Sequence, residues 1–131
     1  GEFDEPLGIT LDAQRNIYVA DTGNDRVQVF NPTGEFLREF GQFGSGPEDL
    51  HLPHGLSVHS TGSVAVADMM NDRVQIFGPD GNVSFAIGRK GAAVGQFEVP
   101  TGVAFGTNDR LTVTDAGNDR IQQFVLRRRS H

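Results

Sequence analysis

The apolar residues of this chain follow a period of two over many short segments. Within residues 17–21, Ile17 and Val19 point to one side of an extended chain, and Tyr18 and Ala20 point to the other. The same columns recur at Val64 and Val66 and at Leu111 and Val113. Such alternation is typical of β-strands, and stretches of turn-forming residues such as DAQRN and NPTG separate the segments. The pattern at the start of the chain predicts four antiparallel strands, near residues 8–12, 16–21, 26–30 and 35–40.

One phrase occurs three times along the chain. It reads DTGNDRVQVF at 21–30, DMMNDRVQIF at 68–77 and DAGNDRIQQF at 115–124, so consecutive copies start 47 residues apart. A strict period of this length indicates a solenoid or a propeller. We divide the chain into units 1–47, 48–94 and 95–131, of which the third ends before a fourth strand would begin. Because both faces of each predicted sheet carry small or apolar residues, we expect an all-β fold of propeller blades that stack radially.

The residues of the first unit resemble a known repeat. The stretches GEF, PLGITLD and NIYVADTGNDRVQVFNPTGEFLREFG within residues 1–41 are similar to the NHL repeat, and in-register copies fill the chain. NHL repeats form β-propellers, commonly of six blades. The resemblance therefore implies half of a six-bladed propeller. More narrowly, it implies the C-terminal half of an NHL domain of the tripartite-motif type, in which a strand from the start of the propeller completes the last blade.

Composition removes several classes of function. The chain has 131 residues, 37% hydrophobic and 21% charged, and no cysteine, which excludes disulfides and thiolate metal sites. No apolar run approaches the roughly 20 residues that cross a bilayer, so we expect no membrane partner. The formal net charge of -6 disfavours a general surface for polyanions. We predict no cofactor, no metal ion and a cytoplasmic location.

The repeated phrase is itself a candidate structural site. An Arg at the start of the third strand can fork bidentately onto a carboxylate, and the Asp that ends the second strand lies just across a tight turn. Asn suits that turn because its side chain bonds nearby backbone. Since active sites are seldom triplicated at equal spacing, we interpret the triplet as a structural latch in every blade. Its members are Asp21, Asn24, Arg26, Asp68, Asn71, Arg73, Asp115, Asn118 and Arg120.

The second copy of the phrase differs from the others at its turn. Met69 and Met70 stand where the neighbouring copies have Thr-Gly at 22–23 and Ala-Gly at 116–117. We expect both glycines to adopt a positive φ, which Met70 would reach only at a cost of about 1 to 2 kcal/mol. The turn shares one edge of the propeller with the connections between units, and we call this edge the loop face. Two exposed Met side chains there indicate a contact surface, because Met adapts to irregular partners.

Two alternatives concern the same region. The methionines could instead fold back over Leu50 or Leu52. His51 and His54 flank a proline on the loop face and would suit a metal or acid–base site, so a propeller enzyme of the lyase or hydrolase type is one alternative function. Equivalent histidines are missing from the other two units, which favours a structural role for this pair.

RNA is the second alternative ligand. The resemblance includes NHL domains that bind single-stranded RNA through a basic face with stacking aromatic rings. Here Arg89 and Lys90 would supply the charge, with Phe43 and His54 as the rings. Acidic residues beside the same turns oppose phosphate, namely Asp25, Asp72 and Asp119.

We predict a non-catalytic platform that recognises protein partners through the loop face. The resemblance implies the substrate-recognition part of a tripartite-motif-like ubiquitin ligase, with ligase activity in segments outside these residues. Three blades leave flat apolar end faces, which monomers avoid. We therefore also expect a homodimer, or pairing with another half-propeller, that closes six blades.

Overall fold

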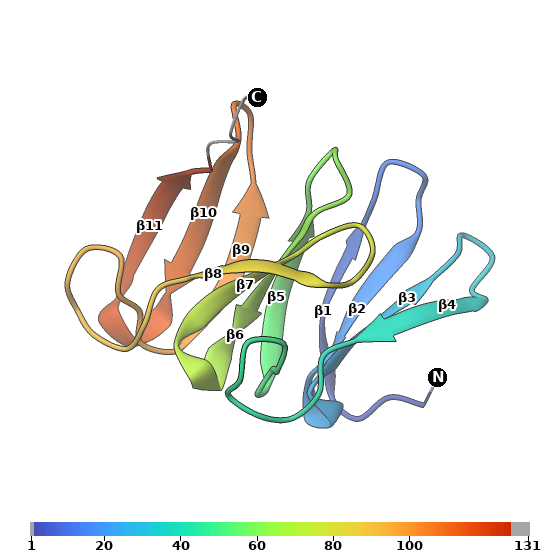
Figure 1. The fold of residues 1–131 in the computed structure, drawn as a ribbon, viewed down its shortest axis with the longest axis horizontal. Coiled ribbons are helices and arrows are strands. Elements are labelled where there is room, and N and C mark those ends of the chain that lie inside the picture. The colour runs from blue at the N-terminus through green and yellow to red at the C-terminus, as the bar shows by residue number, and fades with distance from the viewer. Residues whose placement is uncertain (1, 127–131) are drawn as a thin grey trace.

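The structure, a computed structural model, describes residues 2–126, and its strands form three antiparallel sheets (Figure 1). The first sheet has the order β1 (Pro6–Leu11), β2 (Ile17–Asp21), β3 (Arg26–Phe30), β4 (Phe36–Phe40). The second has the order β5 (Pro53–Val58), β6 (Val64–Asp68), β7 (Arg73–Phe77), β8 (Val83–Ile87). The third has β9 (Pro100–Phe105), β10 (Arg110–Asp115) and β11 (Arg120–Val125). Within residues 2–126 the third sheet therefore lacks an outer strand, and the predicted all-β blade architecture is confirmed.

Short 3-10 turns join the second and third strands of every sheet. They are η1 (Thr22–Asn24), η2 (Met69–Asn71) and η3 (Ala116–Asn118). All three lie at the lower edge of the molecule in Figure 1, beside the connections that lead from one sheet to the next. This edge is the loop face.

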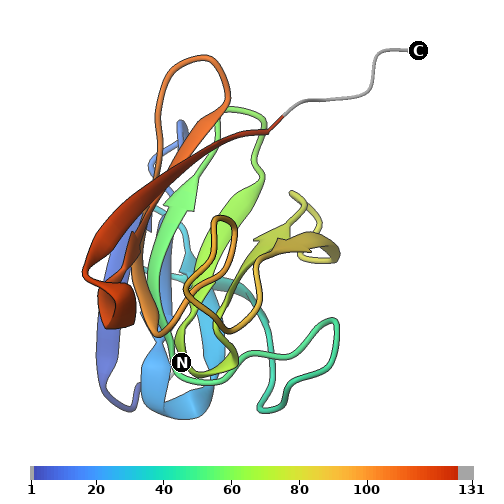
Figure 2. The ribbon, with the colours of Figure 1, turned by 90° about the vertical axis from the view of Figure 1, so that its left-hand side faces the viewer.

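The sheets stand side by side, with β5 between β1 and β9. In Figure 2 the third sheet faces the viewer and the other two lie behind it. Gly8 and Gly55 make this close approach of inner strands feasible. A Cβ atom on Gly8 would overlap the carbonyl oxygen of His54, and one on Gly55 would lie 2.5 Å from the carbonyl oxygen of Thr101. The glycine that recurs at this position in the sequence is therefore required for packing between blades.

The core consists of two apolar layers, one on each side of the second sheet. Between the first and second sheets, the rings of Phe40 and Phe77 pack with centroids 4.7 Å apart. Between the second and third sheets, Ile76 packs with Phe97 and Leu111. The second sheet contributes to both layers because successive side chains of a strand point to opposite faces. Every residue of β6 is buried as a result.

The two outer surfaces of the stack are apolar and exposed. Leu7 and Ile9 lie on the open face of the first sheet, and Ile121 and Val125 lie on that of the third. Ile9 and Ile121 are 71% and 67% exposed. No helix in the described part of the chain is long and apolar enough to cross a membrane.

Candidate functional site

In each sheet the Asp that ends the second strand collects hydrogen bonds from the turn after it. Oδ2 of Asp68 accepts bonds from Nε of Arg73 at 2.7 Å and from Nδ2 of Asn71 at 3.0 Å. Asp21 and Asp115 accept the equivalent bonds within their own units, at 2.7 to 3.0 Å. All three carboxylates are fully buried. The structure thus brings together the Asp, Asn and Arg of each predicted latch.

The arginines do not form the bidentate fork that the sequence suggested. Only Nε of Arg73 reaches the carboxylate, and its Nη2 donates to the carbonyl oxygens of Gly46 and Asp49, at 2.8 and 2.9 Å. Nη2 of Arg120 likewise donates to the carbonyl oxygen of Gln96 at 2.8 Å. The expectation of a fork is wrong because the incoming connection lies along the guanidinium and places carbonyl groups there. Each of these two arginines fastens a connection between units to its sheet.

Two further members of the phrase take part, although the sequence reasoning did not single them out as ties. Nε2 of Gln75 donates to two carbonyl oxygens of the incoming connection, at 2.8 and 3.1 Å. Oδ1 of Asp25 accepts the N–H of Leu52 at 2.8 Å, and Oδ1 of Asp72 accepts that of Val99 at 2.9 Å. The signal was present, since Asn-Asp-Arg-x-Gln recurs in all three copies. Each of these two aspartates therefore ties its unit to the next through Oδ1.

The residue with a positive φ in each turn is an Asp, not the Gly. The φ angle is 55° at Asp25, 53° at Asp72 and 52° at Asp119. Neither Gly23 nor Gly117 has a positive φ, so the prediction for these glycines is wrong. They are needed for space, because a Cβ atom at either position would lie 2.6 Å from the carbonyl oxygen of Asp4 or of Glu98.

Met70 fits its turn because the incoming connection stands slightly farther away. The N–H of Met70 donates to the carbonyl oxygen of His51 at 3.1 Å, whereas the equivalent glycines make this bond at 2.7 Å. Met70 is 47% exposed. Met69 is half-buried and takes the position of Thr22, which is buried in the first turn. The structure therefore exposes Met70 more fully than Met69, where both were expected to be exposed.

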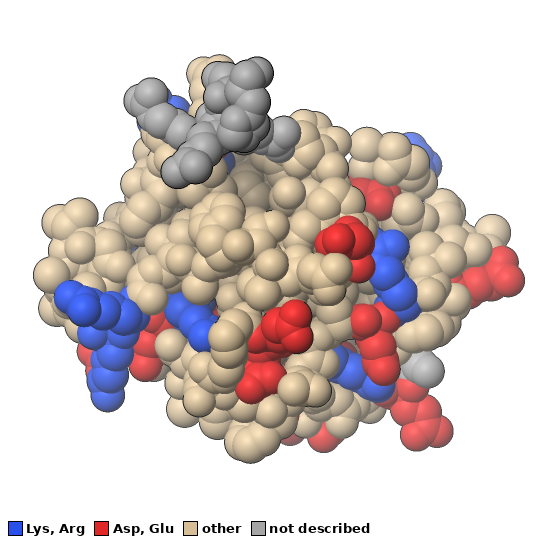
Figure 3. Space-filling view, viewed as in Figure 1, with Lys and Arg blue, Asp and Glu red and all other residues tan. Residues whose placement is uncertain are grey.

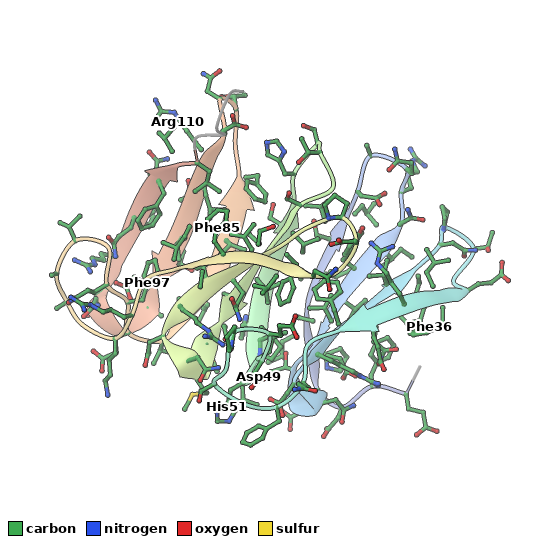
Figure 4. All side chains as sticks on the ribbon, viewed as in Figure 1. Phe36, Asp49, His51, Phe85, Phe97 and Arg110 are labelled. Atoms are coloured by element: carbon green, nitrogen blue, oxygen red, sulfur yellow. The ribbon has the colours of Figure 1, made fainter. Side chains whose placement is uncertain are left out.

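Phe43, His51 and Met70 form a connected group on the loop face, which we call the apolar patch. The rings of Phe43 and His51 meet edge-on, with centroids 4.9 Å apart and planes at 80°. Phe43 is 69% exposed, although a β-bridge to Leu50 holds its backbone. The backbone bond from Met70 to His51 joins the third member. Figure 4 shows His51 below Asp49, at the lower edge of the molecule.

The positions 47 residues further along the chain have different chemistry. Lys90 takes the place of Phe43, Glu98 that of His51 and Gly117 that of Met70. Arg89 and Lys90 are both exposed, in the connection between β8 and β9. Figure 3 shows basic side chains at the left, over this connection, and acidic ones over the connection between β4 and β5. The predicted binding residues therefore divide into the apolar patch and a basic pair one unit away.

His54 lies in β5 and is half-buried. Among residues 2–126, no group of three or more His, Cys, Asp or Glu side chains is placed to hold a metal ion. His51, the other histidine of the predicted pair, packs its ring against Phe43. The two histidines of the predicted pair therefore have different surroundings, one in β5 and one against the Phe43 ring.

The three latch carboxylates differ in their electrostatic environment. Burial raises the pKa of Asp68 above its ordinary value of 3.8, against the hydrogen bonds from Asn71, the N–H of His51 and Arg73. Burial also tends to raise the pKa of Asp21 and of Asp115, but at these two residues the hydrogen bonds outweigh it and hold the pKa below 3.8. Two differences separate Asp68 from the others. Asp21 and Asp115 each accept a further bond from a Gln side chain, at 3.0 and 3.3 Å, which Asp68 lacks, and the second sheet is covered on both faces.

Solved structures with the same arrangement of sheets exist. A streptogramin B lyase superposes with a TM-score of 0.70 at 14% identity, over 93% of this chain and 41% of the lyase chain. A selenomethionine-substituted virginiamycin B lyase from Staphylococcus aureus gives 0.63 at 16% identity, over 91% and 40%. At these identities the likeness concerns the fold alone. It places the chain in the class of propeller-type repeat proteins.

Sequence comparison identifies the repeat. A model of the NHL repeat matches residues 3–30. Protein brain tumor from Drosophila melanogaster is 43% identical over 54 residues, which are 41% of this chain and 5% of that protein. The B-box type zinc finger protein ncl-1 from Caenorhabditis elegans is 50% identical over 36 residues, 28% of this chain and 4% of that protein. Residues 3–30 therefore match the NHL repeat, which is the family that the sequence predicted, and the matches span only a small part of these relatives.

Proposed function

We propose that the chain is a non-catalytic binding platform that recognises protein partners through the apolar patch. The observation that carries the proposal is the exposure of Phe43 (69%) and Met70 (47%) on a turn and a connection held by backbone hydrogen bonds. The next unit keeps the scaffold and replaces these residues. Variation of loop residues on a rigid scaffold is typical of binding sites, and exposed Met suits irregular protein surfaces.

The proposal includes a role within a larger protein. The name of one relative includes a B-box type zinc finger, and the matches cover only a few per cent of both relatives. We propose that the chain serves as the substrate-recognition part of a cytoplasmic, tripartite-motif-like ubiquitin ligase. Ligase activity would belong to other segments of that protein.

Pairing of the end faces is a separate part of the proposal. Ile9 on the first sheet and Ile121 on the third are both more than 60% exposed, which supports further blades on each side. We propose that a second copy supplies them. Size-exclusion chromatography with light scattering at high concentration tests this, and a stable monomer would contradict it.

Panning of a phage-displayed random peptide library tests the apolar patch. The chain should enrich peptides whose binding is lost with Phe43→Ser or with Met69→Ser/Met70→Gly. Phe85→Ser is the matched control, because Phe85 is 46% exposed on the outer strand β8. Peptides that bind all variants equally would overturn the proposal.

Fluorescence anisotropy with short single-stranded RNA at two salt concentrations tests the rival function. Exposed Arg89 and Lys90 are the observation that favours it. Affinity would then fall with salt, with a slope of about -0.7 per neutralised phosphate. Tight binding that is lost with Arg89→Glu/Lys90→Glu and kept with Phe43→Ser would establish RNA as the ligand.

A further inference from the structure

The charges beside the apolar patch point to the chemistry of its partner. We infer that the patch takes a peptide segment in which a large apolar side chain is flanked by Lys or Arg. This inference rests on the proposed function, since it specifies the partner of the same surface. It follows from two carboxylates beside the patch, and from the fact that the nearest arginines already donate to other acceptors.

The two carboxylates are Asp25 and Asp72. Asp25 binds the N–H of Leu52, the residue directly after His51, and Asp72 lies two positions after Met70. In both, Oδ1 is fixed by a backbone N–H, and Oδ2 accepts no hydrogen bond from any residue of 2–126. Each therefore keeps one carboxylate oxygen for a donor from outside.

The arginines of the same turns are already engaged. Arg73 uses Nε on Asp68 and Nη2 on two carbonyl oxygens. Arg26 uses Nε on Asp21 and Nη1 on Glu39, both at 2.7 Å. Their charges are directed to these acceptors, so they are poorly placed to neutralise Asp25 and Asp72.

The third-unit side of the patch carries charges of both signs. Asp72 binds the N–H of Val99, and the residue before it, Glu98, is exposed. Figure 3 also shows acidic side chains over the connection between β4 and β5, which carries Phe43. The exposed pair Arg89 and Lys90 lies on the same connection as Glu98, since Lys90 forms a β-bridge to Phe97. The anionic groups that distinguish the patch are therefore Asp25 and Asp72.

Complementarity selects the partner. An apolar side chain would pack between Phe43 and Met70, and a flanking cation would reach Asp25 or Asp72 as a charge-assisted donor. An Arg in the segment would also stack on the exposed Phe43 ring. A nucleic acid would instead place phosphates beside these carboxylates, which is unfavourable. The arrangement favours a basic, apolar protein segment over RNA.

Three labelled peptides test the inference by fluorescence anisotropy on the 131-residue chain. They share one core and differ only in the flanks: GSKKLFKKSG, GSQQLFQQSG and GSEELFEESG. We expect the Lys peptide to bind at least tenfold tighter than the Gln peptide, and the Glu peptide to bind more weakly than both. Asp25→Asn/Asp72→Asn should bring the Lys-to-Gln ratio close to one. These substitutions remove the charge but keep the Oδ1 acceptor and tolerate the left-handed φ.

The matched control is Asp119→Asn. Asp119 has the same position and φ in the third unit, where Gly117 takes the place of Met70. Its replacement should leave the Lys-to-Gln ratio unchanged, and thermal melts should show that all variants fold. An equal loss of preference with Asp119→Asn would show a general effect of net charge and overturn the inference.

The outcomes separate this inference from the proposed function. If Phe43→Ser weakens all three peptides equally and the wild type shows no preference for Lys, the charge inference fails and the patch remains a binding site. If Phe43→Ser changes nothing, the proposed function fails as well. Absence of binding to every peptide would overturn both.

Discussion

The second sheet and its two neighbours contain the same repeated phrase, but they do not provide the same environment. The second sheet is packed on both faces, and all five residues of β6 are buried. In β10 of the third sheet, buried and exposed residues alternate because one face is uncovered. The pKa of Asp68 is raised, whereas those of Asp21 and Asp115 are lowered. The local bonding also differs, because Gln28 and Gln122 donate to Asp21 and Asp115, whereas Gln75 donates to backbone carbonyl oxygens. The covering of the sheet and this glutamine together set the environment of each carboxylate.

The largest effect on stability is expected when the arginine is removed from the latch of the second sheet, which is covered on both faces. Arg73→Ala should lower the free energy of unfolding by about 3 kcal/mol, because it leaves the buried Asp68 without its ion partner. Arg120→Ala should cost about 1 to 2 kcal/mol, since Arg120 is more exposed and the third sheet is open on one side. Urea unfolding at neutral pH measures both. Arg89→Ala is the control, and equal losses in the two latch variants would refute the comparison.

The inner glycines give the next contrast. Gly55→Ala should cost about 2 kcal/mol, because its Cβ would press on the backbone of β9. At Gly102 the Cβ would meet the Oγ1 atom of Thr114 at 2.8 Å, a side chain that can rotate. Gly102→Ala should therefore cost about 1 kcal/mol or less. Thermal unfolding of the two variants decides this, and a greater loss with Gly102→Ala would contradict the packing argument.

The carboxylates should titrate in a defined order. In carboxyl carbon NMR spectra between pH 2 and 7, we expect the midpoint of Asp68 above 3.8 and those of Asp21 and Asp115 below it. Stability follows from the signs of these shifts. Asp21 and Asp115 stabilise the fold above pH 3.8, and this contribution is lost as pH falls through their folded pKa values. Asp68 is protonated first in the folded state, so its contribution rises as pH falls toward 3.8. Three coincident midpoints would show that burial does not separate the sites.

The smallest effect is expected on the open faces. Ile9→Ala and Ile121→Ala should each change the free energy of unfolding by less than about 0.5 kcal/mol in dilute solution, because both side chains are largely exposed. Val66→Ala, in the middle of the covered sheet, should cost about 2 kcal/mol. A loss above 1 kcal/mol with Ile9→Ala would mean that another surface covers the first sheet.

Much of the fold could be predicted because it is written in local pattern. The period of two identified strands such as β2 and β6, and the spacing of 47 residues identified three equivalent sheets. The Asp, Asn and Arg of the latch were found in the same way, since they are close in sequence. The hydrogen bonds from the N–H of Leu52 to Asp25 and from the N–H of Val99 to Asp72 were missed because each joins residues that lie 27 positions apart.

The sequence by itself determined the strands, the repeat and the residues that could meet within one unit, because alternation and short turns act over a few residues. Only the tertiary structure decided what depends on the space between units. It placed the positive φ of every turn on an Asp, such as Asp72, and not on the Gly that the first and third turns contain. It also directed Nη2 of Arg73 to backbone carbonyl oxygens. It also joined Phe43, His51 and Met70 into one surface while Lys90, in the place of Phe43, lies one unit away. These outcomes depend on how closely one connection approaches the next sheet, a distance that no local pattern specifies.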